Sequence, residues 1–500
     1  MSHDSEAAFA SGEVAGIIQR NANQFFGSLT AGGIWTLCSG REGSAAWPLA
    51  DGVIKAENSK KTVAAVNIAF EYKRQNEGVH GMLTALGQSL AYVEKGYDAS
   101  VVCIPKRYSS HNAPGEHLKR IIEATAPNAP IAVYVYDAPN MADIRPFLGK
   151  IECVRDIDLS KTTVPRKAGG KKISGQISTV WAHVREGMSH PDAFFRYCQA
   201  VKVVSSVGER RTDYKLPNEP IEAVKCIDSD ADPILYLSNT VGDALKDKTW
   251  RYVWYHYYFR DEQIPIFKSR SPYTVNDSET MIRINENQNQ RLFSGRKDSI
   301  KNKIVDKLNA DSNYTENEAW EDYVKKVRKD AHSYREVIDS GLFQLGLIDA
   351  DGFLTNHGFK YVSACEKAGN NPYAEEPMNI LRAVSLQIGQ YDVFLYTAHK
   401  YSRKRFAAYF DDFTRKRGGN EPEFQATDYL EWLNEVLTNQ LHMYRKSTTR
   451  AGGTRKPFQA EMSYLKKLGF VYQDESFRRG IGLNIDWPLV ESSLVFFNSL

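Results

Sequence analysis

The chain has 500 residues, of which 42% are hydrophobic and 25% are charged, and its formal net charge is +3. This length and composition predict a globular protein of about two to four domains and exclude a disordered polymer. The small net charge neither indicates nor excludes a nucleic-acid partner, so the distribution of charge along the chain has to decide.

The sequence shows no sign of export or of a membrane span. The first residues lack the basic and apolar regions of a signal peptide, and no run of about 18 apolar residues occurs. The six cysteines have no Cys-x-x-Cys spacing, which favours buried free thiols over disulfides or a zinc site. We therefore expect a cytoplasmic protein without a membrane partner.

The first 160 residues alternate helical and extended patterns. Their order predicts an α/β domain of three layers, α/β/α, in which a three-strand meander is followed by a helical crossover to a parallel strand. Within the helix after the third strand, Leu83, Leu86, Leu90 and Val93 form an apolar stripe that we expect to be buried. We expect helices over residues 12–29, 77–96 and 115–125, and strands over residues 32–40, 49–57, 61–73, 98–105 and 130–138.

Three further regions follow this first domain, residues 1–160. Residues 161–178 are rich in Lys, Gly and Ser and indicate a basic linker, either solvated or lying along a phosphate backbone. Residues 179–330 are interpreted as an α+β region, with strands expected at 233–239 and 251–259. Residues 331–500 are expected to be mainly helical.

Two segments of the last region resemble parts of a winged helix, a DNA-binding fold. Residues 340–369 combine a helix, an Asp-Gly turn, a short strand and a second helix, and residues 460–474 are a weaker copy. Basic stretches with interspersed aromatics lie at 399–410, 413–419 and 443–458. Such stretches are often only solvated faces, but beside a winged helix they favour double-stranded DNA as the partner.

Three charged residues on neighbouring strands carry the candidate chemistry. Side chains alternate along a strand, so Glu71 and Lys73 share one face and emerge together at the strand end. Asp51 belongs to the preceding strand of the meander, which brings it close to Glu71. Two adjacent carboxylates repel each other unless a hard divalent cation lies between them. A lysine beside that cation can orient a water and stabilise the negative charge of a phosphorane.

This pattern resembles the PD-(D/E)XK nuclease superfamily over about residues 10–140. Asp51 matches the acid of the first motif, and Glu71 and Lys73 match the E-x-K, although Pro48 is displaced from the family's Pro-Asp position. The resemblance implies a restriction-endonuclease-like core in which Asp51 and Glu71 bind Mg²⁺, or Mn²⁺ in its place. Each residue alone has an ordinary explanation, and Asp51 alone could be a turn residue before Gly52.

Two helical segments extend the resemblance. Gln88 and Tyr92 lie one turn apart on the helix after the E-x-K strand and resemble the Q-x-x-x-Y element of recombination-type members, whose polar pair faces DNA. Alone, they read more simply as a surface pair. Glu13, on the first helix, occupies the place of an additional acid that contacts the metal or its water in several restriction enzymes. Gln88 and Tyr92 are therefore candidate catalytic residues, and Glu13 is a candidate metal ligand.

The combined interpretation is a Mg²⁺-dependent DNA endonuclease of restriction type, with separate regions that recognise DNA. Cutting both strands requires two active sites, so we expect a homodimer at least during cleavage. One alternative is an antiphage or recombination nuclease that acts with a partner ATPase or methyltransferase on another chain, since no P-loop motif occurs here. The other is an inactive DNA-binding scaffold.

Overall fold

A computed structural model describes most of the chain, in two compact units. Within the described residues, no helix has both the length and the apolar character needed to cross a membrane. Most of the predicted linker 161–178, residues 406–410 of the basic stretch 399–410, all of 413–419 and most of 443–458 lie outside the described residues. The described residues are 3–30, 32–43, 47–60, 62–138, 148–162, 177–184, 190–207, 216, 218–257, 304, 306–307, 310–405, 426–443, 449–450, 453–454, 458–472 and 484–500.

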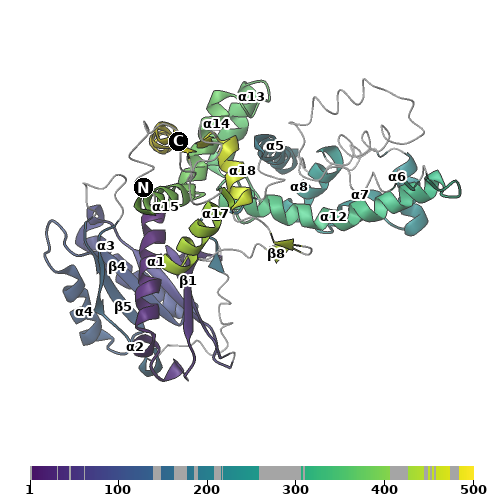
Figure 1. Ribbon diagram of the computed structural model, residues 1–500. Coiled ribbons are helices and arrows are strands. Elements are labelled where there is room, and N and C mark those ends of the chain that lie inside the picture. Colours follow the sequence, from purple (N-terminus) through teal and green to yellow (C-terminus); the bar gives the residue numbers. More distant parts are fainter. Residues whose placement is uncertain are drawn as a thin grey trace, which may run out of the picture. The chain divides into compact units, whose positions relative to one another are not determined.

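Each unit is assembled from separate parts of the chain. The first unit comprises Met1–Trp181, Gln390–Pro457 and Gln473–Asn484, and the second comprises Ala182–Gly389, Phe458–Tyr472 and Ile485–Leu500. The first unit therefore combines the predicted α/β region with a segment from the predicted helical region. Figure 1 traces both units along the chain.

A mixed seven-stranded sheet forms the centre of the first unit, with the order β6-β5-β4-β3-β2-β1-β7. Strands β1, β2 and β3 are antiparallel neighbours, and β3, β4 and β5 run parallel. This confirms the predicted meander and the crossover to a parallel strand, while β6 and β7 were not predicted. The strands are β1 (Trp35–Glu42), β2 (Gly52–Asn58), β3 (Val66–Tyr72), β4 (Ala99–Pro105), β5 (Ile131–Tyr136), β6 (Ile151–Arg155) and β7 (Ile177–Ser178).

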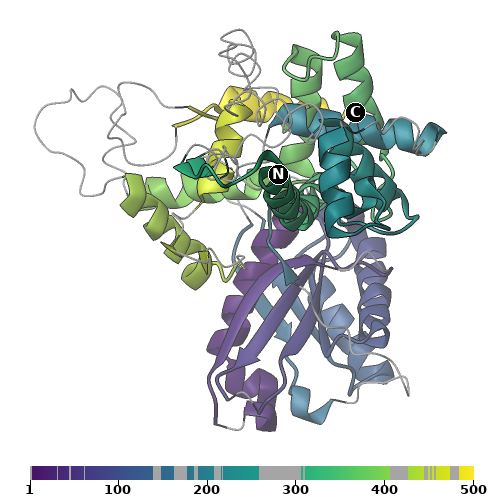
Figure 2. The same ribbon diagram turned by 90° about the vertical axis from the view of Figure 1, so that its right-hand side faces the viewer.

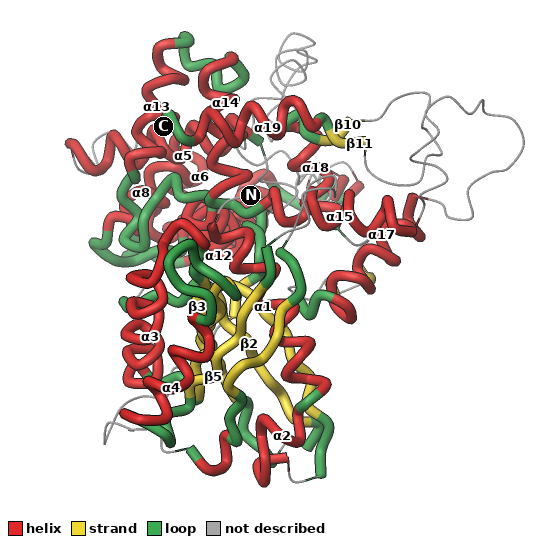
Figure 3. The backbone as a smooth tube through the Cα atoms, turned by 90° about the vertical axis from the view of Figure 1, so that its left-hand side faces the viewer, coloured by secondary structure: helices red, strands yellow, loops and turns green. Residues whose placement is uncertain are grey.

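Helices cover both faces of this sheet, as Figures 2 and 3 show. On one face, α1 (His3–Arg20) and α2 (Ala22–Phe26) share a core with Phe70 and Tyr72 of β3. On the other face, α3 (Gly78–Lys95) and α4 (Pro114–Thr125) pack on the alternate residues of β4 and β5. The N-terminal region is thus α/β, as the pattern predicts.

Two details of the predicted helices are wrong. The first helix begins at His3 rather than at residue 12, because its early turns also bury small residues such as Ala7 and Ala10. In α3, Leu83 and Leu90 are each 47% exposed, whereas Met82 and Tyr92 are fully buried. The buried stripe therefore contains the polar Tyr92, because that side chain has a partner on the sheet.

A C-terminal segment completes the first unit. Helix α15 (Tyr391–Arg405) meets α1 where Ser5 Oγ donates to both oxygens of Asp392 at 2.7 Å. The amide of Ser39 in β1 donates to the carbonyl of His442 at 2.6 Å. The segment's other elements are α17 (Ala426–Glu435), a π-helical turn (Val436–Gln440), β8 (Thr449–Arg450) and β9 (Gly453–Thr454).

The second unit is mainly helical, with the long helix α12 packed on α6 and α7 (Figure 1). The prediction of strands at 233–239 and 251–259 is wrong for the described residues, because 233–238 and 251–257 are helical. Trp250, Val253 and Trp254 are buried at helical spacing, so packing outweighs the β propensity of the aromatics. The helices are α5 (Pro191–Val207), α6 (Asn218–Ile227), α7 (Pro233–Ser238), α8 (Leu245–Val253), α12 (Glu316–Gln344), α13 (Asn356–Lys367), α14 (Glu375–Gln387), α18 (Gln459–Lys467) and α19 (Trp487–Phe497).

The two segments that resemble parts of a winged helix contain the predicted helices but only short strand pairings. In 340–369, the end of α12 leads to a turn closed by the bridge between Ile348 and Leu354, and α13 begins after Thr355. The predicted strand is thus reduced to a single bridge. In 460–474, α18 leads into β10 (Val471–Tyr472), which pairs with β11 (Asn484–Ile485).

Candidate active site

The end of β3 places Glu71 and Lys73 toward α3. Glu71 is fully buried, Lys73 is 7% exposed, and Lys73 Nζ lies 2.5 Å from Glu71 Oε1. The Lys73 amide donates to the carbonyl of Cys103 at 3.0 Å, so the ladder with β4 continues past the last strand residue. The alternation of faces predicted from the sequence is confirmed, since Phe70 and Tyr72 pack on the α1 side.

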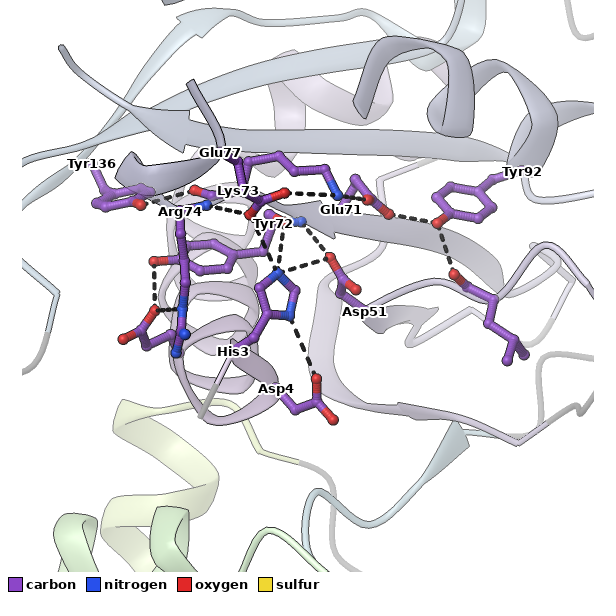
Figure 4. Close-up of polar contacts among 12 residues, drawn as sticks. His3, Asp4, Asp51, Glu71, Tyr72, Lys73, Arg74, Glu77, Tyr92 and Tyr136 are labelled. Atoms are coloured by element: carbon purple, nitrogen blue, oxygen red, sulfur yellow. Dashed lines mark hydrogen bonds and ion pairs between the residues drawn. The ribbon is translucent and has the colours of Figure 1, made fainter. Parts of the chain in front are cut away.

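The register of the meander brings Asp51 to the end of β3, where Glu71 and Lys73 lie. Gly52 of β2 pairs with Phe70 of β3, so Asp51 comes opposite Glu71. Asp51 Oδ2 accepts the Tyr72 amide at 2.8 Å. The strand pairing that orders the sheet therefore also places Asp51 across from Glu71 (Figure 4).

The electrostatics match a site that favours positive charge. Burial, and then the charge of Glu71, raise the pKa of Asp51 to about 7, against the opposing effects of His3, the Tyr72 amide and Lys73. For Lys73, burial lowers the pKa, but the hydrogen bond and charge of Glu71 outweigh it and raise the pKa overall. Lys73 is therefore a cation at neutral pH, and the nearby carboxyl of Asp51 resists ionisation.

Tyr92 belongs to this cluster, and Gln88 lies one turn before it on α3. The Tyr92 hydroxyl donates toward Glu71 Oε2 at 2.5 Å and toward the carbonyl of Leu49 at 2.8 Å. Burial, and then the charge of Glu71, raise the pKa of Tyr92 well above its usual range, so the hydroxyl stays a neutral donor. Tyr92 is fully buried and thus faces Glu71 rather than a DNA surface. Gln88 Oε1 is buried without a hydrogen-bond partner in the described part of the chain.

His3 is a member of the site that sequence reasoning missed. Its Nε2 lies 3.1 Å from the Tyr72 carbonyl, 4.0 Å from Asp51 Oδ2 and 3.9 Å from Glu77 Oε1. Burial lowers the pKa of His3, but the hydrogen bond to Asp4 and the charge of Asp51 outweigh it and raise the pKa to about 9. Figure 4 shows the imidazole beside Asp51. Nothing in the local sequence links His3 to a strand end about 50–70 residues later.

Glu13 lies apart from these residues. It is exposed on α1, ten residues and therefore about 15 Å of helix axis beyond His3. The acidic side chain of α1 that does reach the strand end is Glu6, which bonds Arg74 Nε at 2.7 Å. The structure therefore does not bring Glu13 to Asp51 and Glu71.

The donors at this strand end suit a hard cation. Within the described residues, no group of three or more His, Cys, Asp or Glu side chains is arranged to hold a metal. Asp51 and Glu71 supply two carboxylates, and each carboxylate has lone pairs beyond those used by Tyr72, Lys73 and Tyr92. Mg²⁺ usually binds one or two carboxylates and fills its other positions with water and substrate phosphate. These residues therefore fit Mg²⁺ or Mn²⁺.

The chain matches no protein-family model and no curated protein.

Proposed function

We propose that this protein is a metal-dependent nuclease of the PD-(D/E)XK type, with a restriction-endonuclease-like core in its first unit. The observation that carries the proposal is the register that sets Asp51 opposite Glu71 while Lys73 bonds Glu71. Two acids that can hold a divalent cation and a lysine that stabilises developing negative charge together supply the chemistry for phosphodiester hydrolysis. The substrate class we propose is double-stranded DNA.

Each residue has a role that follows from its contacts. Asp51 and Glu71 would hold Mg²⁺, which supplies a Lewis acid for the phosphate and lowers the pKa of a bound water. Lys73, protonated and almost buried, stabilises negative charge on the phosphate as the attacking oxygen approaches. Tyr92 holds one oxygen of Glu71, which fixes the orientation of that carboxylate.

Recognition of DNA is proposed for the second unit. Its support is the order of α18, β10 and β11, a helix followed by paired strands, as in a winged helix. Restriction-type cleavage by a dimer is the preferred form of the proposal. Action with a partner ATPase or methyltransferase on another chain remains the alternative within nucleases.

Cleavage of supercoiled plasmid in Mg²⁺ or Mn²⁺ tests the activity, with Glu71→Gln and Lys73→Met as the informative variants. The matched control is Lys55→Met/Glu57→Gln, because these residues form a 2.5 Å ion pair on the neighbouring strand but are partly or largely exposed. We expect the wild type and the control to cut, and each site variant to lose at least about 100-fold in rate. A wild type that cuts no duplex, single-stranded or modified DNA and no RNA with either ion would exclude the nuclease and favour the scaffold.

A further inference from the structure

The short segment before Asp51 is held by side chains rather than by a strand. Lys95 Nζ donates to the Pro48 carbonyl at 2.6 Å, and the Tyr92 hydroxyl donates to the Leu49 carbonyl at 2.8 Å. The Ala50 amide donates to Glu42 Oε2 at 3.0 Å. Pro48, Leu49 and Ala50, which precede the candidate metal ligand Asp51, are thus each held by one hydrogen bond between a side chain and their backbone.

Two of these three anchors form a buried ion pair. Glu42 is the last residue of β1 and Lys95 the last of α3, and Lys95 Nζ contacts Glu42 Oε1. Their side chains are only 5% and 10% exposed, and Tyr97 also hydrogen-bonds to Glu42. The pair therefore ties the sheet and the helix together at the segment that carries Asp51.

Stability alone explains this pair poorly. A buried ion pair seldom stabilises a fold more than apolar residues of similar volume, because both charges lose their hydration. The further bonds of Glu42 and Lys95 reach the backbone of residues 48–50, at the edge of the site. Groups that orient a metal ligand in this way strongly affect metal affinity, since the ligand has to be held to within about 0.5 Å.

We propose that Glu42 and Lys95 are positioning residues, which set the Asp51 carboxylate for a divalent cation by fixing the backbone of residues 48–50. The inference rests on the proposed function, because it assumes that Asp51 binds the metal. Neither residue needs to contact the metal or DNA itself.

The test measures Mn²⁺ affinity by calorimetry on the full chain, with Glu42→Gln/Lys95→Met as the main variant. The double change removes both charges together, so no unpaired charge is left buried and the fold should persist. We expect about 10- to 100-fold weaker Mn²⁺ binding, and a plasmid cleavage rate that approaches the wild-type rate only at high Mn²⁺ concentration. The single variant Lys95→Arg keeps a cationic donor at this position. It should bind Mn²⁺ more tightly than Glu42→Gln/Lys95→Met and less tightly than the wild type.

Lys55→Met/Glu57→Gln is again the control, since it removes an ion pair of the same sheet outside the site. Circular dichroism and thermal unfolding show which variants are folded at the temperature of the titration. Wild-type Mn²⁺ affinity in the folded Glu42→Gln/Lys95→Met protein overturns the positioning role and leaves the proposed nuclease intact. A wild type that binds neither Mn²⁺ nor Mg²⁺ overturns the proposed function, and this inference with it.

Discussion

The hydroxyl of Tyr92 shares its one proton between two acceptors, Glu71 in the site and the Leu49 carbonyl beside it. Tyr92→Phe keeps the ring and removes this donor from a buried environment, where a lost hydrogen bond costs about 1–3 kcal/mol. We expect a loss of this size in the free energy of unfolding, measured with urea. Tyr108→Phe is the matched control, because Tyr108 is 3% exposed and its hydroxyl has no hydrogen-bond partner in the described part of the chain. Equal losses in both variants would contradict a specific role for the Tyr92 hydroxyl.

With Asp51 as the proposed metal ligand, its raised pKa predicts a pH-dependent response to Mg²⁺. A carboxyl with a pKa of about 7 in the folded chain holds its proton where the unfolded chain, with the ordinary value of 3.8, has lost it. Its contribution to stability is therefore full below about pH 4 and is lost as the pH rises to about 7. A cation binds the ionised form, so Mg²⁺ has to displace this proton at low pH.

Thermal unfolding with and without Mg²⁺ measures this linkage. We expect the stabilisation by Mg²⁺ to increase between about pH 5.5 and 7.5 and then to level off. Asp51→Asn should abolish most of the increase, because the amide cannot ionise. A shift that is independent of pH in the wild type would show that Asp51 is not a ligand.

Residues whose partners lie on the next strand or the next helix could be predicted from the sequence. Asp51, Glu71 and Lys73 follow from strand alternation and meander pairing, whereas the resemblance implies a DNA-facing Tyr92, which in the structure bonds Glu71. His3 could not be found in this way, because its neighbours come from distant strands. Lys95 lies three residues after Tyr92 and thus on the same helical face, a spacing that, in retrospect, points to the site.

Among the elements, the turn before α13 depends on one threonine. Thr355 Oγ1 accepts the Gly358 amide at 3.1 Å, as an N-cap, and donates to the Gly346 carbonyl at 2.5 Å. Thr355→Ala should lower the free energy of unfolding by about 0.5–2 kcal/mol. Hydrogen exchange of the first amides of α13 should accelerate as well. Thr355→Ser keeps the hydroxyl and should retain nearly wild-type values, so an equal loss in both variants would exclude the cap.

Strands that are buried on both faces were predictable because they form continuous apolar runs, as β4 and β5 do. Strand β6 escaped prediction because it is short and mostly only partly buried. For α8, local β propensity predicts a strand, whereas the helical spacing of Trp250, Val253 and Trp254 indicates the helix that forms. That spacing is present in the sequence itself, so the helix could be predicted from it.

At the scale of the whole chain, the set of segments that make up the first unit could not be predicted from the sequence. Ser5 and Asp392 are 387 residues apart, and no local pattern indicates that they meet. Arg41 is also part of this contact: burial lowers its pKa to about 10, against the charges of Asp4 and Asp392. The first unit therefore includes residues beyond the α/β region that the hydrophobic periodicity of the sequence predicts.

Because the first unit includes residues 390–457, we expect that residues 1–181 do not fold well alone. Without residues 390–457, Ser5 loses its acceptor, the amide of Ser39 loses the carbonyl of His442, and Arg41 loses the charge of Asp392. We expect the isolated fragment to be largely insoluble, and co-expression with residues 390–457 to recover soluble complex. A 390–457 segment carrying Asp392→Ala is the control and should recover much less, because Ser5 then lacks its acceptor and Arg41 lacks the charge of Asp392. A soluble 1–181 fragment that unfolds cooperatively at the temperature of the full chain would show that the sheet needs no C-terminal segment.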